Sequence, residues 1–131
     1  MRITKENIHK FIYGTIMNCD NYGITGIDYI PEGITSLLCL GNKLTTLPHL
    51  PEGLISLNCR NNKLTSLPKL PDNLKALNCD NNKLTKLPKL PESLIYLLCG
   101  YNNLSHPITI DNFKEHNKLI KRKEILSKIC V

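Results

Sequence analysis

A tract of twenty residues is repeated four times in this chain of 131 residues, and it constrains the fold more than any other feature. The second copy, residues 47–66, reads LPHLPEGLISLNCRNNKLTS. Residues 67–86 and 87–106 follow it closely, while residues 27–46 match it with two prolines fewer. A fixed period of this length predicts a solenoid, in which each unit buries its apolar face only against its neighbours. Because the repeats fill most of the chain, we expect a single domain and no separate catalytic domain.

The spacing L-x-x-L-x-C-x-x-N-x-L predicts which way the residues of each unit face. Alternation around Leu57 and Cys59 predicts a short strand with both side chains inward, and with Asn58 and Arg60 outward. Stacking such strands gives a parallel sheet. The other half of the unit, L-P-x-L-P, has prolines that fix an extended path, and twenty residues leave little length for a helix. We expect this side to be extended or 3₁₀, with inward leucines at Leu47, Leu50, Leu67, Leu70, Leu87 and Leu90.

Five of the six cysteines recur at the same inward position, twenty residues apart: Cys19, Cys39, Cys59, Cys79 and Cys99. A buried free cysteine behaves as a small hydrophobic residue. Neighbouring strands hold these sulfurs about 4.8 Å apart, but parallel Cβ vectors give a poor disulfide torsion. No C-x-x-C motif occurs and no histidine accompanies the column. We expect reduced core thiols, with a disulfide or a metal site as the alternative, and reduced thiols indicate a cytosolic setting.

An asparagine column follows the strands, at Asn42, Asn62, Asn82 and Asn102. An inward amide at such a turn can satisfy backbone groups that the turn leaves unpaired and can bond to the next rung. We therefore expect these asparagines to be structural rather than to contact a ligand.

The two ends of the repeat array need caps, because a solenoid otherwise exposes an apolar face at each end. We expect an N-terminal cap helix within residues 1–14, with Thr4 as its N-cap. About five repeats fill residues 15–110, and a C-terminal cap helix covers residues 111–131. On that helix Leu119, Leu126 and Cys130 align on one apolar side, with Ile120 and Ile129 beside them.

The repeat L-P-x-L-P-x-x-L-x-x-L-x-C-x-x-N-x-L-T-x resembles the short leucine-rich repeat of enterobacterial secreted effectors. It is also similar to repeat proteins encoded by giant viruses of amoebae. The resemblance covers about residues 15–110. It implies an α/β leucine-rich-repeat solenoid with a parallel sheet on the concave face, an extended or 3₁₀ convex side and terminal capping helices. Fold alone does not fix function.

Some of these bacterial effectors carry a C-terminal ubiquitin-ligase domain with a Cys-x-Asp nucleophile. Here Cys19-Asp20 and Cys79-Asp80 lack the spacer residue, and both cysteines belong to the core column. We therefore expect no such activity in this chain. A remnant or accessory of such an effector is a third hypothesis, which requires a further domain downstream.

The distribution of charge gives no sign of catalysis. The formal net charge is +6, half of it within residues 111–131. A column of His49, Lys69 and Lys89 lies three residues before one of Glu52, Asp72 and Glu92, which predicts an ion-paired outer surface rather than a nucleic-acid stripe. No nucleophile, base and orienting group stand at a suggestive spacing. We expect a protein that is not an enzyme and that uses no cofactor or metal.

The outward positions of the sheet vary from repeat to repeat, whereas the inward columns do not, and several carry apolar or aromatic side chains. Such residues are typical of binding surfaces. We predict that a protein partner, of unknown identity, binds the concave face through Leu38, Leu40, Asn58, Arg60, Asn78, Asp80, Tyr96, Leu98 and Tyr101.

The alternative function is binding of nucleic acid or an anionic surface through the basic C-terminal helix. We do not favour it, because exposed lysines on a helix are ordinary. No apolar run reaches the roughly 18 to 20 residues of a membrane span, and no signal peptide is evident. We expect a monomer or weak dimer in the cytoplasm, which is the host's cytoplasm if the protein is viral or an effector.

Overall fold

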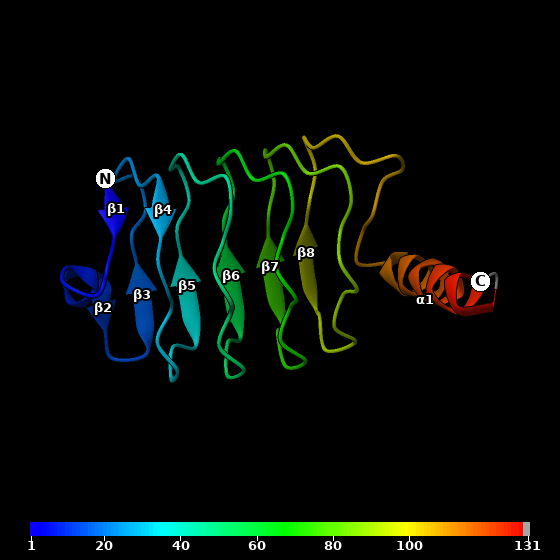
Figure 1. The fold of residues 1–131 in the computed structure, drawn as a ribbon, viewed down its shortest axis with the longest axis horizontal. Helices are drawn as coiled ribbons and strands as arrows, with labels where there is room; N and C mark the ends of the chain where they lie inside the picture. Colours follow the sequence, from blue (N-terminus) through cyan, green and yellow to red (C-terminus); the bar gives the residue numbers. More distant parts are fainter. Residues whose placement is uncertain (130–131) are drawn as a thin grey trace.

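The repeats form the successive rungs of a solenoid, stacked along the long axis of the molecule (Figure 1). The structure is a computed structural model that describes residues 1–129. Each rung contributes one short strand to the main sheet: β3 (Ile16–Asn18), β5 (Ser36–Leu38), β6 (Ser56–Asn58), β7 (Ala76–Asn78) and β8 (Tyr96–Leu98). These strands pair in parallel and in chain order, so the predicted parallel sheet is confirmed.

The register of the sheet stacks equivalent residues of successive repeats. Leu37 pairs with Leu57, Leu57 with Leu77, and Leu77 with Leu97. This leucine column and the cysteine column beside it are buried in every rung. The leucines of the L-P-x-L-P segment close the core from the other side, and all are buried except Leu67, which is half-buried. The core is therefore a stack of inward columns that runs through the molecule.

The asparagine column is structural, as predicted, but each asparagine joins its rung to the preceding one rather than to the next. Asn62 Oδ1 accepts a hydrogen bond from Leu44 N at 3.0 Å. Asn62 Nδ2 donates to the carbonyl oxygens of Cys39 at 2.9 Å and Cys59 at 3.0 Å. Asn42, Asn82 and Asn102 repeat this pattern. Because each amide serves the preceding rung, the first repeat needs none, and Tyr22 takes its place there.

The side opposite the sheet is extended, as the prolines predict. A four-residue turn begins at each of Pro51, Pro71 and Pro91, and it is closed by a hydrogen bond from the leucine three residues later to the proline carbonyl. No helix forms between rungs. The fold class predicted from the repeat is thus confirmed, with a short extended crossover in place of a helix.

The N-terminal end differs from the predicted helix. The strand β1 (Arg2–Ile3) pairs in parallel with β4 (Gly26–Ile27), and β2 (Ile12–Tyr13) pairs antiparallel with β3. Between them only one 3₁₀ turn, η1 (Ile8–Phe11), is helical. Strand pairing on both sides satisfies the backbone groups that a longer helix would have used.

Thr4 does not cap this turn through its side chain, contrary to the prediction. Asn7 precedes the turn, and Asn7 Oδ1 instead accepts a hydrogen bond from Thr4 N at 2.8 Å. Ile8 and Phe11 are buried against the first rung, so the segment still covers the apolar end.

The C-terminal helix forms where it was predicted, as α1 (Phe113–Ile129). Its first two turns dock on the extended side of the last rung. Phe113, His116 and Asn117 are buried there. Asn117 pairs with the backbone of Leu90, accepting from its N at 2.8 Å and donating to its carbonyl at 2.7 Å. His116 Nε2 lies 3.1 Å from the Pro88 carbonyl oxygen.

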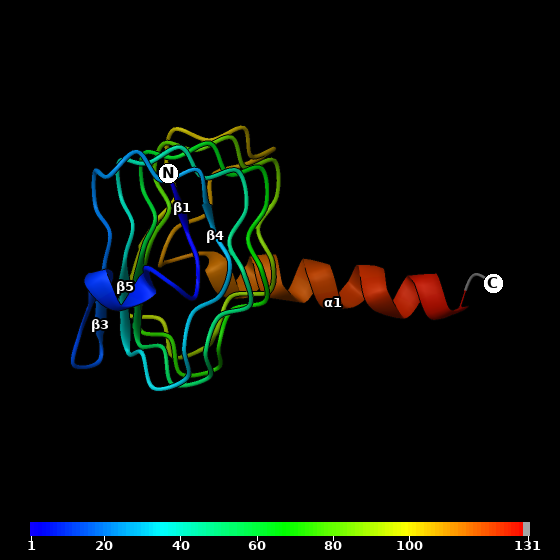
Figure 2. The ribbon, with the colours of Figure 1, turned by 60° about the vertical axis from the view of Figure 1, so that its left-hand side comes forward.

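The apolar side predicted for this helix does not dock. Leu119 is 46% exposed and Leu126 is 57% exposed, and the rest of the helix extends away from the rungs (Figure 2). The docked side lies about a third of a turn away. It includes two polar side chains that pair with backbone groups, which a search for apolar spacing misses. Cys130, the third residue of the predicted side, lies outside the described residues.

Candidate binding surface

The nine residues predicted to bind a partner lie along the sheet, on strands β5 to β8 and in the turns that follow them. They differ in exposure. Arg60, Tyr96, Leu98 and Tyr101 are exposed, while Leu38, Leu40, Asn58 and Asp80 are half-buried. Asn78, predicted on the open face, is only 9% exposed. The exposed members of the set concentrate at the β8 end of the sheet.

Three of the polar residues have partners within the solenoid. Asn58 Oδ1 accepts from Arg60 N at 3.3 Å, and Asn78 Oδ1 accepts from Asp80 N at 3.1 Å. Asp80 Oδ1 in turn accepts from Gly100 N at 2.6 Å. Each of these side chains therefore satisfies a backbone N–H at the end of a strand.

The alternation of residue types on this face follows from the same need. Where the strand ends in asparagine, that asparagine bonds the N–H two residues later. Where it ends in Leu38 or Leu98, no amide is present, and the aspartate of the preceding rung bonds the N–H instead. Asp20 does this for Leu40 at 2.8 Å, as Asp80 does for Gly100. Much of the sequence variation across the middle of the sheet thus has a structural cause.

A left-handed backbone position follows each strand by three residues. It has positive φ in every rung, at Asn21, Gly41, Asn61, Asn81 and Tyr101. Asparagine and glycine tolerate this conformation, whereas a bulky residue there is an outlier. A side chain on Gly41 would also collide with Asn21. Tyr101, which has a φ of 52° and is 88% exposed, is therefore the exception in this column. The recurrence of asparagine and glycine at this position indicated the left-handed conformation in the sequence. The prediction from the sequence missed this conformation, because it treated these positions only as outward-facing.

The β8 end of the sheet presents an open edge and an apolar surface together. In the inner rungs the cysteine N–H donates to the next strand, as Cys79 N does to Leu98 O at 2.8 Å. Within residues 1–129 the N–H of Cys99 has no such acceptor. Four apolar side chains are exposed beside this edge: Ile95, Tyr96, Leu98 and Tyr101. We call these four residues the β8 patch.

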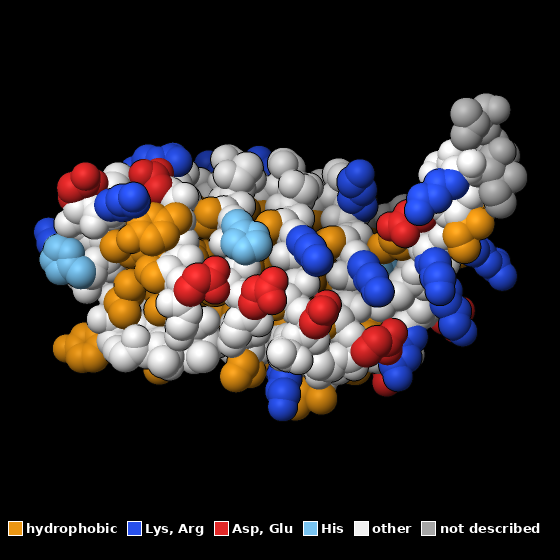
Figure 3. Space-filling view, turned by 60° about the horizontal axis from the view of Figure 1, so that its bottom comes forward, with side chains coloured by type: hydrophobic (Ala, Val, Ile, Leu, Met, Phe, Trp, Pro, Cys, Tyr) orange, Lys and Arg blue, Asp and Glu red, His pale blue; other side chains and the backbone are white. Residues whose placement is uncertain are grey.

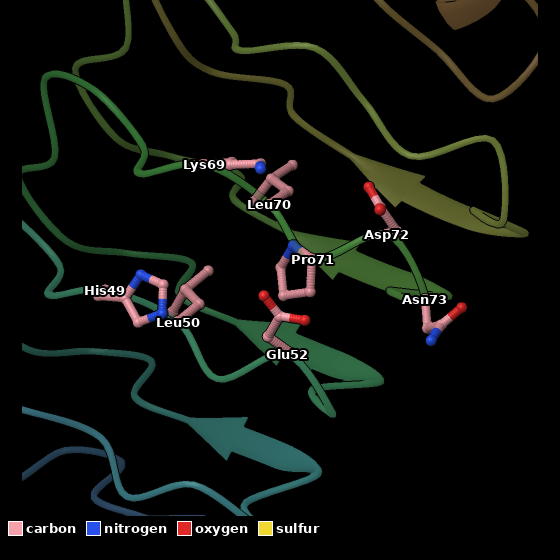
Figure 4. A pocket seen from close by; sticks show the side chains of 8 residues that line it. All are labelled: His49, Leu50, Glu52, Lys69, Leu70, Pro71, Asp72 and Asn73. Carbon is pink, nitrogen blue, oxygen red and sulfur yellow. The ribbon is translucent and has the colours of Figure 1, made fainter.

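The charged columns on the opposite side do not form the predicted ion pairs. Figure 3 shows a row of acidic side chains beside a row of lysine and histidine. Among residues 1–129, the one ion pair that involves either column joins Glu92 to Lys114 of α1 at 3.8 Å. The two rows run side by side across successive rungs, and all their members are exposed. A shallow hollow of about 160 Å³ lies between them, lined by residues that include Glu52 and Lys69 (Figure 4).

The cysteine column has the chemistry of a core rather than of a reactive site. The five described cysteines are free and buried. Burial raises the pKa of Cys19 and Cys59 to about 12. Burial and the Asp80 carboxylate raise the pKa of Cys99 to about 11. Burial also raises the pKa of Cys39 and Cys79 well above the ordinary value. Because the thiolate is the nucleophile, these thiols are inert near neutral pH.

Within residues 1–129, no group of three or more His, Cys, Asp or Glu side chains could hold a metal ion. No described helix is both long and apolar enough to cross a membrane.

The rungs, the asparagine column and the extended crossovers together define a class: the chain has the fold of a short-repeat leucine-rich-repeat protein. Its structural neighbours are leucine-rich-repeat domains of bacterial effectors. A Shigella effector LRR domain is 34% identical, with a TM-score of 0.71, over 81% of this chain and 48% of that one. YopM from Yersinia enterocolitica WA-314 is 32% identical, with a TM-score of 0.62, over 66% of this chain and 20% of that one.

The chain thus spans about half of the Shigella domain and a fifth of YopM. A scan against family models finds no match, and neither does a search of curated protein sequences.

Proposed function

We propose that this protein is an interaction module without catalytic activity, which binds a protein partner through the β8 end of its sheet face. The β8 patch is the observation that supports this most directly. Tyr96 is 50% exposed, and Tyr101 stands in a backbone conformation that its equivalents in other rungs fill with asparagine or glycine. Backbone strain of this kind clusters at functional and ligand-binding sites. Tyrosine is also among the residues that dominate binding energy at interfaces.

The proposed binding surface is smaller than the nine-residue surface predicted from the sequence. Asn58, Asn78 and Asp80 already bond backbone groups of the solenoid, so they contribute shape more than free polar groups. Arg60 is exposed and lies on the same face, two rungs from β8, and completes the surface. The likeness to effector domains and the reduced thiols favour a partner in a host cytoplasm.

A capture experiment with matched variants tests this function. The protein is immobilised and exposed to human and amoebal cell lysates. These are chosen because the repeat resembles those of enterobacterial effectors and of giant viruses of amoebae. The test variant is Tyr96→Ser with Tyr101→Asn, and the control is Lys121→Glu with Lys128→Glu on α1. We expect a protein retained by the parent and the control but lost by the test variant, with at least a tenfold loss of affinity once that protein is purified.

The control also tests the basic helix. A partner that the sheet variant keeps and the lysine variant loses would move the function to α1. Binding that also falls steeply with salt would identify that partner as nucleic acid or an anionic surface.

A further inference from the structure

A groove separates one side of α1 from the last rung, away from the β8 patch. Its volume is about 560 Å³, within the range of about 300 to 1,000 Å³ that is typical of ligand sites. Residues 85–89 and 104–108 form one wall, and α1 forms the other. The groove is mainly apolar, with Leu87, Leu104 and Ile108 from the rung side and Leu119 and Ile120 from the helix.

From Lys121 to Lys128 the helix lacks packing. All side chains of residues 121–128 are exposed, so the second half of α1 contacts no core. Isolated helices shorter than about 12 to 15 residues are marginal in water, and most helices in proteins are stabilised by packing an apolar face. Leu119 and Leu126 form such an apolar face, and both are exposed. This face begins in the groove at Leu119 and continues along the helix beyond it.

The charge around the groove favours an acidic occupant. Lys86, Lys89 and Lys123 line it against a single acidic residue, Glu124. The hollow on the other side of α1 shares Lys89 and Glu124 with the groove and is lined by four lysines and four acidic residues in all. Two ion pairs already form there, Lys114–Glu92 and Lys118–Glu115. The excess positive charge therefore belongs to the apolar groove.

The same charge argues against a second copy of this chain as the occupant. Between Phe113 and Ile129 the helix has six lysine or arginine residues and two glutamates. Two such helices packed together would place like charges opposite each other, which disfavours the complex.

We propose that this groove binds an acidic amphipathic helix of a protein partner. The helix lays its apolar side between Leu119 and the last rung, and its carboxylates face Lys86 and Lys123. The lining residues of α1 recur at intervals of three and four: His116, Leu119, Ile120, Lys123 and Glu124. This is the spacing that one helix presents to another laid along it. The proposal is independent of the β8 patch, because the two surfaces share no residue.

The probe for this site is a fluorescein-labelled synthetic peptide with leucines on one helical side and glutamates on the other. Its control is a peptide of the same composition with the leucine side scrambled. Binding to the full chain is followed by fluorescence anisotropy. We expect the amphipathic peptide to bind about tenfold more tightly than the scrambled one, because only it can place its leucines in the groove.

Matched variants locate the binding. Leu119→Ser should weaken the amphipathic peptide about tenfold, whereas Ile125→Ser, also exposed on α1 but outside the groove, should leave it unchanged. Lys86→Glu with Lys123→Glu should weaken it by a similar factor, and Lys128→Glu should have little effect. Circular dichroism checks that every variant retains α1 and the sheet.

Three outcomes overturn the proposal. The first is no binding of the amphipathic peptide. The second is equal binding of the two peptides with equal sensitivity to Lys123→Glu and Lys128→Glu, which indicates general attraction to a basic helix. The third is a concentration-dependent dimer in sedimentation that Leu119→Ser dissociates, which makes the groove an interface between copies.

Discussion

The middle rungs and the last rung are built from the same repeat but use its outward positions differently. In the middle, Asn58 and Asn78 bond the N–H groups at the ends of their own strands, and Asp80 bonds that of the next rung. In the last rung the equivalent positions hold Leu98 and Gly100, which offer no such group. The strand β8 also has no neighbour on its far side within residues 1–129.

This difference shows when an outward residue of a solenoid is free to take part in binding. A position whose side chain bonds a backbone N–H, in its own rung or the next, must keep its asparagine or aspartate, whatever partner is present. Leu98 can be apolar because Asp80 of the preceding rung serves the Gly100 N–H, as Asp20 does for the rung of Leu38. Within residues 1–129, only at the end of the stack is there also no following rung to serve, and there Tyr101 occupies a strained turn. Each of the following predictions tests whether the middle is determined by structure and the end by binding.

The largest effect is expected from the cysteine column at alkaline pH. In the unfolded chain the thiols lose their protons from the ordinary pKa of 9.0 upward, whereas the folded state retains them up to about 12 at Cys59. Above pH 9 the unfolded state therefore binds fewer protons, and stability falls as the pH rises. Each fully buried thiol should contribute up to about 1.4 kcal/mol per pH unit. Urea unfolding followed by circular dichroism at a series of pH values measures the slope.

Two variants distinguish the middle of the column from its end. Cys59→Ala should reduce the fall in unfolding free energy per pH unit by one thiol's contribution, up to about pH 12. Cys99→Ala should reduce it in the same way, but only up to about pH 11. A stability that is flat between pH 9 and 11 in the parent would show that the thiols do not resist ionisation, and the buried column would have to be abandoned.

The second prediction compares two members of the asparagine column. Asn62→Ala should lower the free energy of unfolding by about 1 to 3 kcal/mol, because it leaves buried groups of two rungs without partners. Asn102→Ala should cost less. Asn102 makes the same bonds but is half-exposed at the end of the stack, so water replaces part of what is lost. Chemical denaturation measures both, and equal losses would remove the distinction between the middle and the end.

The sequence predicted the repeating parts of the molecule because their physical cause lies within one repeat. Leu57 and Cys59 had to face inward once the period was known, and Asn62 had to serve a turn. The prolines likewise fixed the extended crossover. In each case the same local requirement is met in nearly every rung, so the pattern repeats in the sequence and can be recognised.

The rest depended on contacts that do not repeat. The N-terminal segment became strands because β1 and β2 found partners in the first rungs, which no local helix signal reveals. The helix α1 docks through Asn117 and His116, and their backbone partners on residues 88 and 90 are defined only by the packed structure. Which outward residues are free likewise emerges from bonds between rungs, as Asp80 with Gly100 shows.

The smallest effect is the most specific, and it has the opposite sign. Tyr101→Asn restores the residue type that the left-handed position holds in rungs with Asn61 and Asn81. Left-handed strain in a bulky residue costs on the order of 1 kcal/mol or more. The new amide could also extend the ladder in which Asn81 Nδ2 donates to Asn61 Oδ1 at 2.8 Å. We expect Tyr101→Asn to stabilise the fold by about 1 kcal/mol, a rise of about 3 to 5 °C in Tm by differential scanning calorimetry.

The reverse change, Asn81→Tyr, should destabilise the fold by at least as much, because it adds the strain and removes the hydrogen bond from Asn81 to Asn61. If Tyr101→Asn lowers Tm instead, the tyrosine supports the end of the stack, and its presence there needs no binding partner to explain it. If it raises Tm and weakens a captured partner, stability has been given up at this one rung for recognition.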